Sequence, residues 1–220
     1  MCLIALAWQV DAARPLVVAA NRDEFHGRPA APAGFWQDRP TILAGRDLEA
    51  RGTWMGVSRN GRFAAVTNYR GGREASAAES RGALVTRFLE GDAAPADYVG
   101  SIEGGRYSGF NLLAADDREL WWLSNRDGTP RRLDPGIYGL ANLLLDSPDV
   151  EDTKRRFAAA PPTLESLFGV LDAARIVNPA YGTRCSTVVV KGAGEIRYAE
   201  RTFSPAGEMQ ETLRYEFPLA

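Results

Sequence analysis

The chain has 220 residues, 45% of them hydrophobic, and its 26 basic and 28 acidic residues give a formal net charge of −2. A chain of this length buries about 70% of its unfolded surface, so we expect one soluble domain over residues 1–220. Charges of both signs are spread along the sequence, which disfavours nucleic acid as a partner. One histidine and two cysteines disfavour a zinc site and a disulfide framework. No apolar run is long enough to span a membrane and no basic leader precedes the N-terminal apolar residues, so we predict a cytoplasmic location.

The first 70 residues contain two predicted β-hairpins. Residues 2–10 and 15–20 are apolar and β-prone, and a polar turn at 11–14 separates them. Residues 53–58 and 63–67 flank Asn60 and Gly61, a pair that supplies the positive φ angles of a tight turn. The chain therefore begins inside a sheet.

Helical spacing begins at Ser80, a predicted N-cap, and ends at Gly91, and a second helix is predicted over 96–103. Strands follow at 110–115 and 119–124, where Trp121 and Trp122 are expected to pack in the core. After a turn at Asp127 come helices over 150–159 and 163–174, then strands over 186–190 and 195–202. Strand blocks flanking helix blocks indicate an α+β fold rather than a parallel βαβ sheet.

Cys2 is the first candidate for chemistry. A small second residue normally allows the initiator methionine to be removed, which leaves Cys2 with both a thiol and a free α-amine. The amine has a pKa near 8 and a thiol near 8.5, so the amine can take the thiol proton without a histidine. The alternative is that Cys2 is a small apolar residue at the start of a buried strand.

Polar residues at predicted strand ends form the rest of the candidate site. Asn21, Arg22, Asp23 and Glu24 are expected to follow the second strand directly. An arginine beside the thiolate would lower the pKa of the thiol, and an acid could hold the α-ammonium in place. Further strand-end polar residues are Asn68, Asn142 and Arg184, and amides at such ends can donate to a developing oxyanion. Each residue alone is more typical of a turn or a solvated surface, so the prediction depends on the set.

Short motifs along nearly the whole chain resemble the NRDE family, which is also named for transport and Golgi organisation protein 2. They are Met1-Cys2, Asn21-Arg22-Asp23-Glu24-Phe25, Ala44-Gly45-Arg46-Asp47, Gly52-Thr53-Trp54-Met55-Gly56, Thr67-Asn68-Tyr69-Arg70, Ser80-Arg81-Gly82, Gly109-Phe110-Asn111-Leu112-Leu113, Gly139-Leu140-Ala141-Asn142 and Tyr181-Gly182-Thr183-Arg184.

That family resembles the N-terminal-nucleophile hydrolases of the choloylglycine hydrolase and penicillin V acylase type. The resemblance implies a four-layer αββα sandwich of two stacked antiparallel sheets. It carries the site of that group to Cys2, Arg22, Asp23, Asn68, Asn142 and Arg184. The spacing from the arginine differs from the family pattern at the acid, so Glu24 is an alternative to Asp23. His26 and Cys185 stand where an aromatic residue and a serine are expected.

Two functions follow from these expectations. The first is a cysteine amidohydrolase or thioesterase that acts on a small acylated molecule of the lipid or acyl-CoA type and needs no cofactor. The second is a non-catalytic carrier of haem or lipid that uses the same pocket, with His26 and Cys2 as candidate haem ligands. A purely structural module would explain neither Cys2 nor the polar strand ends.

Overall fold

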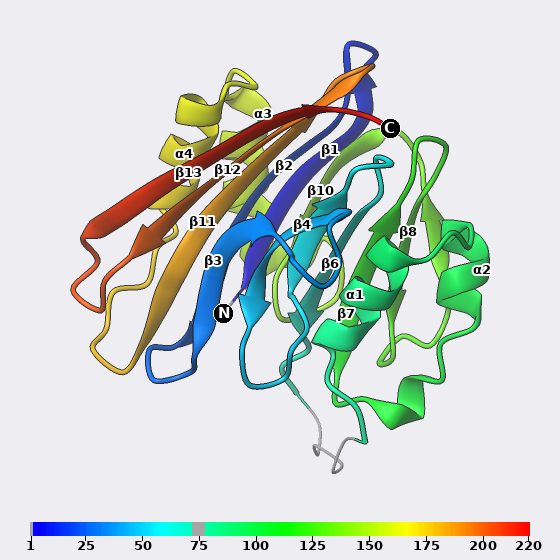
Figure 1. The fold of residues 1–220 in the computed structure, drawn as a ribbon, viewed down its shortest axis with the longest axis horizontal. Coiled ribbons are helices and arrows are strands. Elements are labelled where there is room, and N and C mark those ends of the chain that lie inside the picture. Colours follow the sequence, from blue (N-terminus) through cyan, green and yellow to red (C-terminus); the bar gives the residue numbers. More distant parts are fainter. Residues whose placement is uncertain (1, 72–77) are drawn as a thin grey trace. The chain divides into compact units, whose positions relative to one another are not determined.

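The computed structural model describes residues 2–71 and 78–220, which divide into two compact units (Figure 1). The first unit holds the residues up to Arg28, Pro135–Ala141 and Asp146–Leu219. The second unit holds Pro29–Asp134, Asn142–Leu145 and Ala220. Each unit is built on one antiparallel sheet, as the sequence predicts.

The sheet of the first unit has the order β10-β1-β2-β11-β12-β13. Its strands are β1 (Leu3–Asp11), β2 (Arg14–Phe25), β10 (Gly136–Leu140), β11 (Tyr181–Lys191), β12 (Glu195–Phe203) and β13 (Met209–Pro218). One face packs against helices α3 (Glu151–Ala159) and α4 (Leu164–Asp172), which follow the 3-10 turn η2 (Pro148–Val150) (Figure 1).

Period-two alternation explains which residues of the first sheet face the helices. Ala5, Val17, Ala19, Val188 and Val190 form one buried cluster with apolar residues of α3 and α4. Successive side chains of a strand point to opposite faces, so Cys2, Ile4 and Arg22 belong to the register of the other face. The first hairpin is therefore confirmed, and its turn at residues 12–13 is shorter than predicted.

The sheet of the second unit has the order β3-β4-β5-β6-β7-β8-β9. Its strands are β3 (Ala30–Phe35), β4 (Ile42–Asp47), β5 (Met55–Ser58), β6 (Phe63–Asn68), β7 (Phe110–Ala115), β8 (Leu120–Ser124) and β9 (Arg131–Leu133). Helices α1 (Gly82–Glu90) and α2 (Pro95–Gly100) contact this sheet, and η1 (Gly104–Arg106) follows them. Trp122 is fully buried, as predicted for core packing.

Local signals in the second unit were partly right. The hairpin of β5 and β6 is confirmed, but only Gly61 takes a positive φ, of 82°, so Asn60 does not share the left-handed conformation. Ser80 is not the N-cap of α1, because the helix begins one residue later than expected, after Arg81. Gly91 does end the helix. Among the described residues, no helix is long and apolar enough to cross a membrane.

Candidate active site

Cys2 lies directly before β1, which is hydrogen-bonded to a strand on each side. The residue is partly buried, and its thiol approaches the backbone carbonyl oxygen of Asp23 at 3.9 Å. The contact joins the start of β1 to the end of β2, since Leu3 pairs with Asn21. The first strand therefore places the candidate nucleophile beside the predicted polar cluster.

The polar cluster is part of β2 and does not follow it, which corrects the predicted strand end. β11 pairs with β2 from Leu16 to Phe25, and this pairing satisfies the backbone of the polar residues. Asn21 is buried within this strand and binds the Leu171 carbonyl and the Ser186 hydroxyl. Asn21 thus ties the sheet to α4, whereas the next two residues lie at the site.

A β-bulge in β11 sets the register opposite the cluster. Thr183 pairs with Asp23 and Cys185 pairs with Arg22, so Arg184 is the extra residue between them. An extra residue in one strand bends that strand and turns its side chains. The bulge therefore brings a threonine hydroxyl to the carboxylate of Asp23.

Asp23 is held by residues of the neighbouring strand β11, whereas the Glu24 side chain contacts residues close to it in the sequence. The Thr183 hydroxyl donates to Oδ1 of Asp23 at 2.6 Å, and the Tyr181 hydroxyl donates to the Asp23 carbonyl at 3.2 Å. Glu24 accepts a hydrogen bond from the Phe25 amide at 2.8 Å and forms ion pairs with Arg22 at 3.7 Å and with Arg28 at 4.0 Å. The geometry favours Asp23 as the acid of the candidate site.

Burial, and not the arginine, dominates the electrostatics of the thiol. The pKa of Cys2 is raised, first by burial and then by the negative charge of Asp23, while Arg22 acts in the opposite direction. Arg22 therefore lowers the thiol pKa as expected, but burial and Asp23 outweigh it. Burial also raises the pKa of Asp23, and the hydrogen bond from Thr183 opposes that rise.

Arg184 holds the turn that follows β2. Its Nη1 donates to the carbonyl oxygens of Phe25, His26 and Arg28 at 3.1, 3.3 and 2.9 Å. Burial lowers the pKa of Arg184, and the charge of nearby Arg22 adds to the effect. Arg184, which the sequence predicts to be catalytic, thus fixes the backbone of this turn.

Asn68 and Asn142 lie together in the second unit, although 74 positions separate them. Asn142 donates from Nδ2 to the Asn68 carbonyl at 2.6 Å, and its own carbonyl accepts from the Arg70 amide at 2.6 Å. Asn68 is the last residue of β6, as predicted. An amide nitrogen has two protons, so one donor of Asn142 is left for another acceptor.

Cys2, Arg22, Asp23 and Arg184 are thus neighbours in the first unit, and the two asparagines are neighbours in the second. The convergence of all six on one site stays a prediction.

Sequence reasoning gave no role to three residues that hold candidate residues within one unit or the other. Thr183 and Tyr181 bind Asp23, and both stand in a quoted motif. Asn111 is fully buried and donates to Thr67 at 3.2 Å and to the Leu143 carbonyl at 2.8 Å, which fixes the segment beside Asn142. The available signal was an asparagine inside the apolar strand Phe110–Ala115.

His26 does not have a free Nε2. That nitrogen lies 3.1 Å from the Asn178 carbonyl oxygen, so ligation of haem through Nε2 would require breaking this contact. In the part of the chain that the structure describes, no group of three His, Cys, Asp or Glu residues is placed to hold a metal ion. Haem as a cargo stays a prediction.

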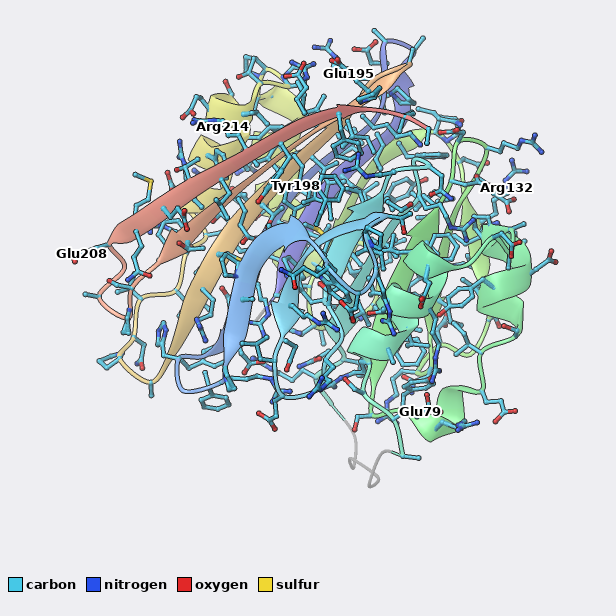
Figure 2. The ribbon with its side chains drawn as sticks, viewed as in Figure 1. Glu79, Arg132, Glu195, Tyr198, Glu208 and Arg214 are labelled. Carbon is cyan, nitrogen blue, oxygen red and sulfur yellow. The ribbon has the colours of Figure 1, made fainter. Side chains whose placement is uncertain are left out.

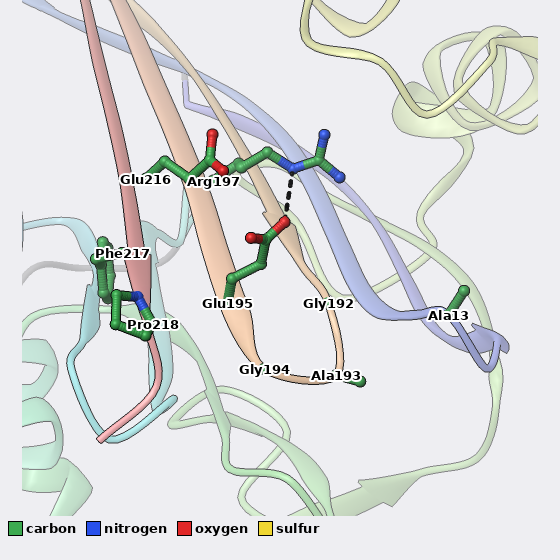
Figure 3. Close-up of a pocket in the computed structure, with 9 residues that line it drawn as sticks. All are labelled: Ala13, Gly192, Ala193, Gly194, Glu195, Arg197, Glu216, Phe217 and Pro218. Atoms are coloured by element: carbon green, nitrogen blue, oxygen red, sulfur yellow. Dashed lines mark ion pairs between the residues drawn. The ribbon is translucent and has the colours of Figure 1, made fainter.

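A cleft of about 630 Å³ lies elsewhere on the first unit (Figure 3). Its lining includes Ala13, which precedes β2, and the ion pair of Glu195 and Arg197, whose atoms are 3.6 Å apart. Figure 2 shows Glu195 and Glu208 at opposite ends of this part of the molecule, in agreement with their positions at the start of β12 and after its end. The cleft is thus at the far end of the sheet from Cys2 and has no nucleophile.

Comparisons with known proteins agree with this fold. The solved structure of a Caenorhabditis elegans N-acylethanolamine-hydrolyzing acid amidase ortholog matches with a TM-score of 0.56, at 11% identity, over 86% of this chain and 92% of that one. The C2A variant of the conjugated bile acid hydrolase from Clostridium perfringens matches with a TM-score of 0.55, at 9% identity, over 99% of this chain and 97% of that one. These likenesses confirm the predicted α+β fold class, which this chain shares with both solved structures.

Comparisons of sequence identify the family of this chain. The Transport and Golgi organization 2 homolog of Mus musculus is 33% identical, over 93% of this chain and 92% of the relative. The corresponding protein of Homo sapiens is 34% identical over the same shares. The model of the family described as Transport and Golgi organisation 2 matches residues 1–167. The chain therefore belongs to the Transport and Golgi organisation 2 family, as its motifs indicate.

Proposed function

We propose that this protein is an N-terminal cysteine hydrolase that cleaves the amide or thioester bond of a small acylated molecule of the lipid or acyl-CoA type. The observation that carries the proposal is the contact of the Cys2 thiol with the end of β2, where Arg22 and Asp23 lie. The fold, shared with an amidase ortholog and a bile acid hydrolase, supports it.

The first step needs a base, because burial raises the pKa of the Cys2 thiol. Once Met1 is removed, the α-amine of Cys2 takes the thiol proton while Sγ attacks the carbonyl carbon of the substrate. Asp23 accepts a hydrogen bond from this amine and so orients it. Arg22 contributes a positive charge beside the sulfur, where negative charge gathers before attack.

The later steps return that proton to the leaving group. As the tetrahedral intermediate collapses, the amine or thiol of the substrate leaves with the proton, and an acyl group remains on Sγ. The same α-amine then takes a proton from water, which attacks the thioester and releases the acid. The family resemblance assigns the hydrogen bonds to the oxyanion, a contact worth about 3 kcal/mol in other enzymes, to Asn68 and Asn142.

The test is hydrolysis of p-nitrophenyl hexanoate and of a short acyl thioester by protein whose intact mass shows that Met1 is absent. The wild-type chain is compared with Cys2→Ala, which permits the same methionine removal but lacks the thiol. We expect turnover by the wild-type chain and none above background by the variant. Equal rates in the two proteins would refute the proposal.

The carrier alternative assigns haem to the same unit. It predicts that haem added to the purified protein gives a saturable Soret shift that weakens in His26→Ala or Cys2→Ala. A non-saturating spectrum that is identical in the variants would exclude haem as the cargo. The contact of His26 Nε2 with the Asn178 carbonyl leads us to rank the hydrolase first.

A further inference from the structure

Thr183 lies in the candidate site without a role in the steps above. It is 3% exposed and faces Asp23 because the bulge of β11 pairs it with that residue. Its hydroxyl lies 2.6 Å from Oδ1 of Asp23 and 2.9 Å from the backbone nitrogen of Ile176. The amide of Thr183 in turn donates to the Ile176 carbonyl at 2.9 Å, so the residue is fixed from two sides.

The direction of these hydrogen bonds follows from counting protons. A threonine hydroxyl has one proton, and the Ile176 N–H already uses one of its lone pairs. The hydroxyl proton is therefore available to Asp23, so Oδ1 of Asp23 is the acceptor. An oxygen that accepts this bond is an oxygen that does not bear the proton of the carboxyl group.

We propose that Thr183 is a positioning residue that keeps the Asp23 carboxylate ionised and fixed in one orientation near the end of β2. The role rests on the proposed function, because Asp23 matters only if it orients the amine of Cys2. Tyr181 completes the arrangement by holding the carbonyl oxygen of Asp23, so residues from one end of β11 fix both the backbone and the side chain of Asp23.

The surroundings of Asp23 make such a partner necessary. Asp23 is 5% exposed, and burial raises its pKa, which favours the neutral acid. The hydrogen bond from Thr183 is the largest of the described influences that lower this pKa. A neutral Asp23 would lack the negative charge that holds a protonated amine, and one of its oxygens would carry a proton.

The experiment compares Thr183→Val, which has the same shape without the hydroxyl, with Thr183→Ser, which keeps the hydroxyl. Thr86→Val is the matched control, because Thr86 is also buried and its hydroxyl donates to the Gly82 carbonyl of α1 at 3.1 Å. Two readouts are taken on full chains lacking Met1. The first is the pKa of Asp23 from the carboxyl carbon resonance in NMR, assigned with Asp23→Asn. The second is the pH profile of p-nitrophenyl hexanoate hydrolysis.

The proposal predicts that Thr183→Val raises the pKa of Asp23 by about one to two units. The acid limb of the activity profile should move to higher pH by the same amount. Thr183→Ser and Thr86→Val should stay within a few tenths of a unit of the wild-type chain. If Thr183 had only a structural role, Thr183→Val would lower activity at every pH. The pKa of Asp23 and the midpoint pH of the acid limb would then stay unchanged, and that result would overturn the proposal.

The two hypotheses fail separately. Absence of hydrolysis by the wild-type chain contradicts the proposed function, and the NMR titration still decides whether Thr183 controls Asp23. Normal hydrolysis with an unchanged Asp23 pKa in Thr183→Val contradicts the positioning role alone.

Discussion

The two cysteines occupy different electrostatic environments around one arginine. Cys185 pairs with Arg22 across β11 and β2, whereas Cys2 precedes the strand on the other side of β2. Cys185 is buried, and burial together with the charge of Glu200 raises its thiol pKa well above the usual value. Cys2 is partly exposed, and burial together with the charge of Asp23 raises its thiol pKa as well.

This contrast predicts selective alkylation of Cys2 by iodoacetamide in protein lacking Met1. The thiolate is the reactive form, and only Cys2 combines access to solvent with a neighbouring amine. Peptide mass spectrometry over time should show Cys2 modified at least about tenfold faster than Cys185, with the rate increasing as pH rises toward the thiol pKa. Similar rates at both positions would mean that Cys2 is an inert strand residue.

Asp23→Asn should separate activity from stability. Because burial raises the pKa of Asp23, its ionised form costs stability at pH values above the unfolded pKa, and the cost grows until the folded pKa is passed. The amide has no charge to bury, so the melting temperature at neutral pH should equal or exceed that of the wild-type chain. Ester hydrolysis should fall at least about tenfold.

Glu24→Gln is the matched control for Asp23→Asn. Glu24 binds Arg22 and Arg28 but receives no bond from Thr183. Its variant should keep hydrolysis within about threefold of the wild-type rate. If Glu24→Gln loses activity and Asp23→Asn keeps it, the acid has been assigned to the wrong residue.

At the scale of elements, Gly52 and Gly82 stand in two different sequence motifs and lie against each other in the structure. A side chain on Gly52 would place its Cβ 2.7 Å from the carbonyl carbon and 2.8 Å from the carbonyl oxygen of Gly82. Gly82 is the first residue of α1, so the loop before β5 touches the backbone of that helix. Backbone atoms cannot rotate away from a clash as the end of a side chain can.

Gly52→Ala should therefore destabilise the protein by more than about 2 kcal/mol, because the helix or the loop must shift. Gly105→Ala is the control, since no atom lies within 4 Å of the added Cβ. Urea unfolding should show a lower midpoint for the first variant and a nearly unchanged one for the second. Equal midpoints would mean that the contact of loop and helix is not tight.

Element prediction succeeded where the local pattern was strong. The apolar spacing of α1 and the apolar, β-prone residues of β7 placed both elements within two residues. Strand β3 contains Pro32 and Gly34, which disfavour strands, and it forms because β4 pairs with it around an irregular register. β13 was missed although Leu213, Tyr215 and Phe217 alternate with charged residues, which is the pattern of a half-buried strand.

At the scale of the whole molecule, each unit combines segments that are distant in sequence. The bond of Thr183 to Asp23 spans 160 positions, and the bond of Asn142 to Asn68 spans 74. Hydrophobic periodicity reports only neighbours along the chain, so it could not assign these pairs. The family motifs identified most of the residues because the resemblance carries long-range information, but it left Asp23 and Glu24 unresolved.

The central claim is that Cys2 acts through its own amine. The most direct measurement is hydrolysis of a short acyl thioester by three proteins: the chain without Met1, the same chain with an N-terminal extension, and Cys2→Ala. An extension converts the amine to an amide and removes the base but leaves the thiol, so all three should melt alike. The account predicts multiple turnovers by the processed chain only. Turnover by the extended chain at the processed rate, or by Cys2→Ala, would contradict it.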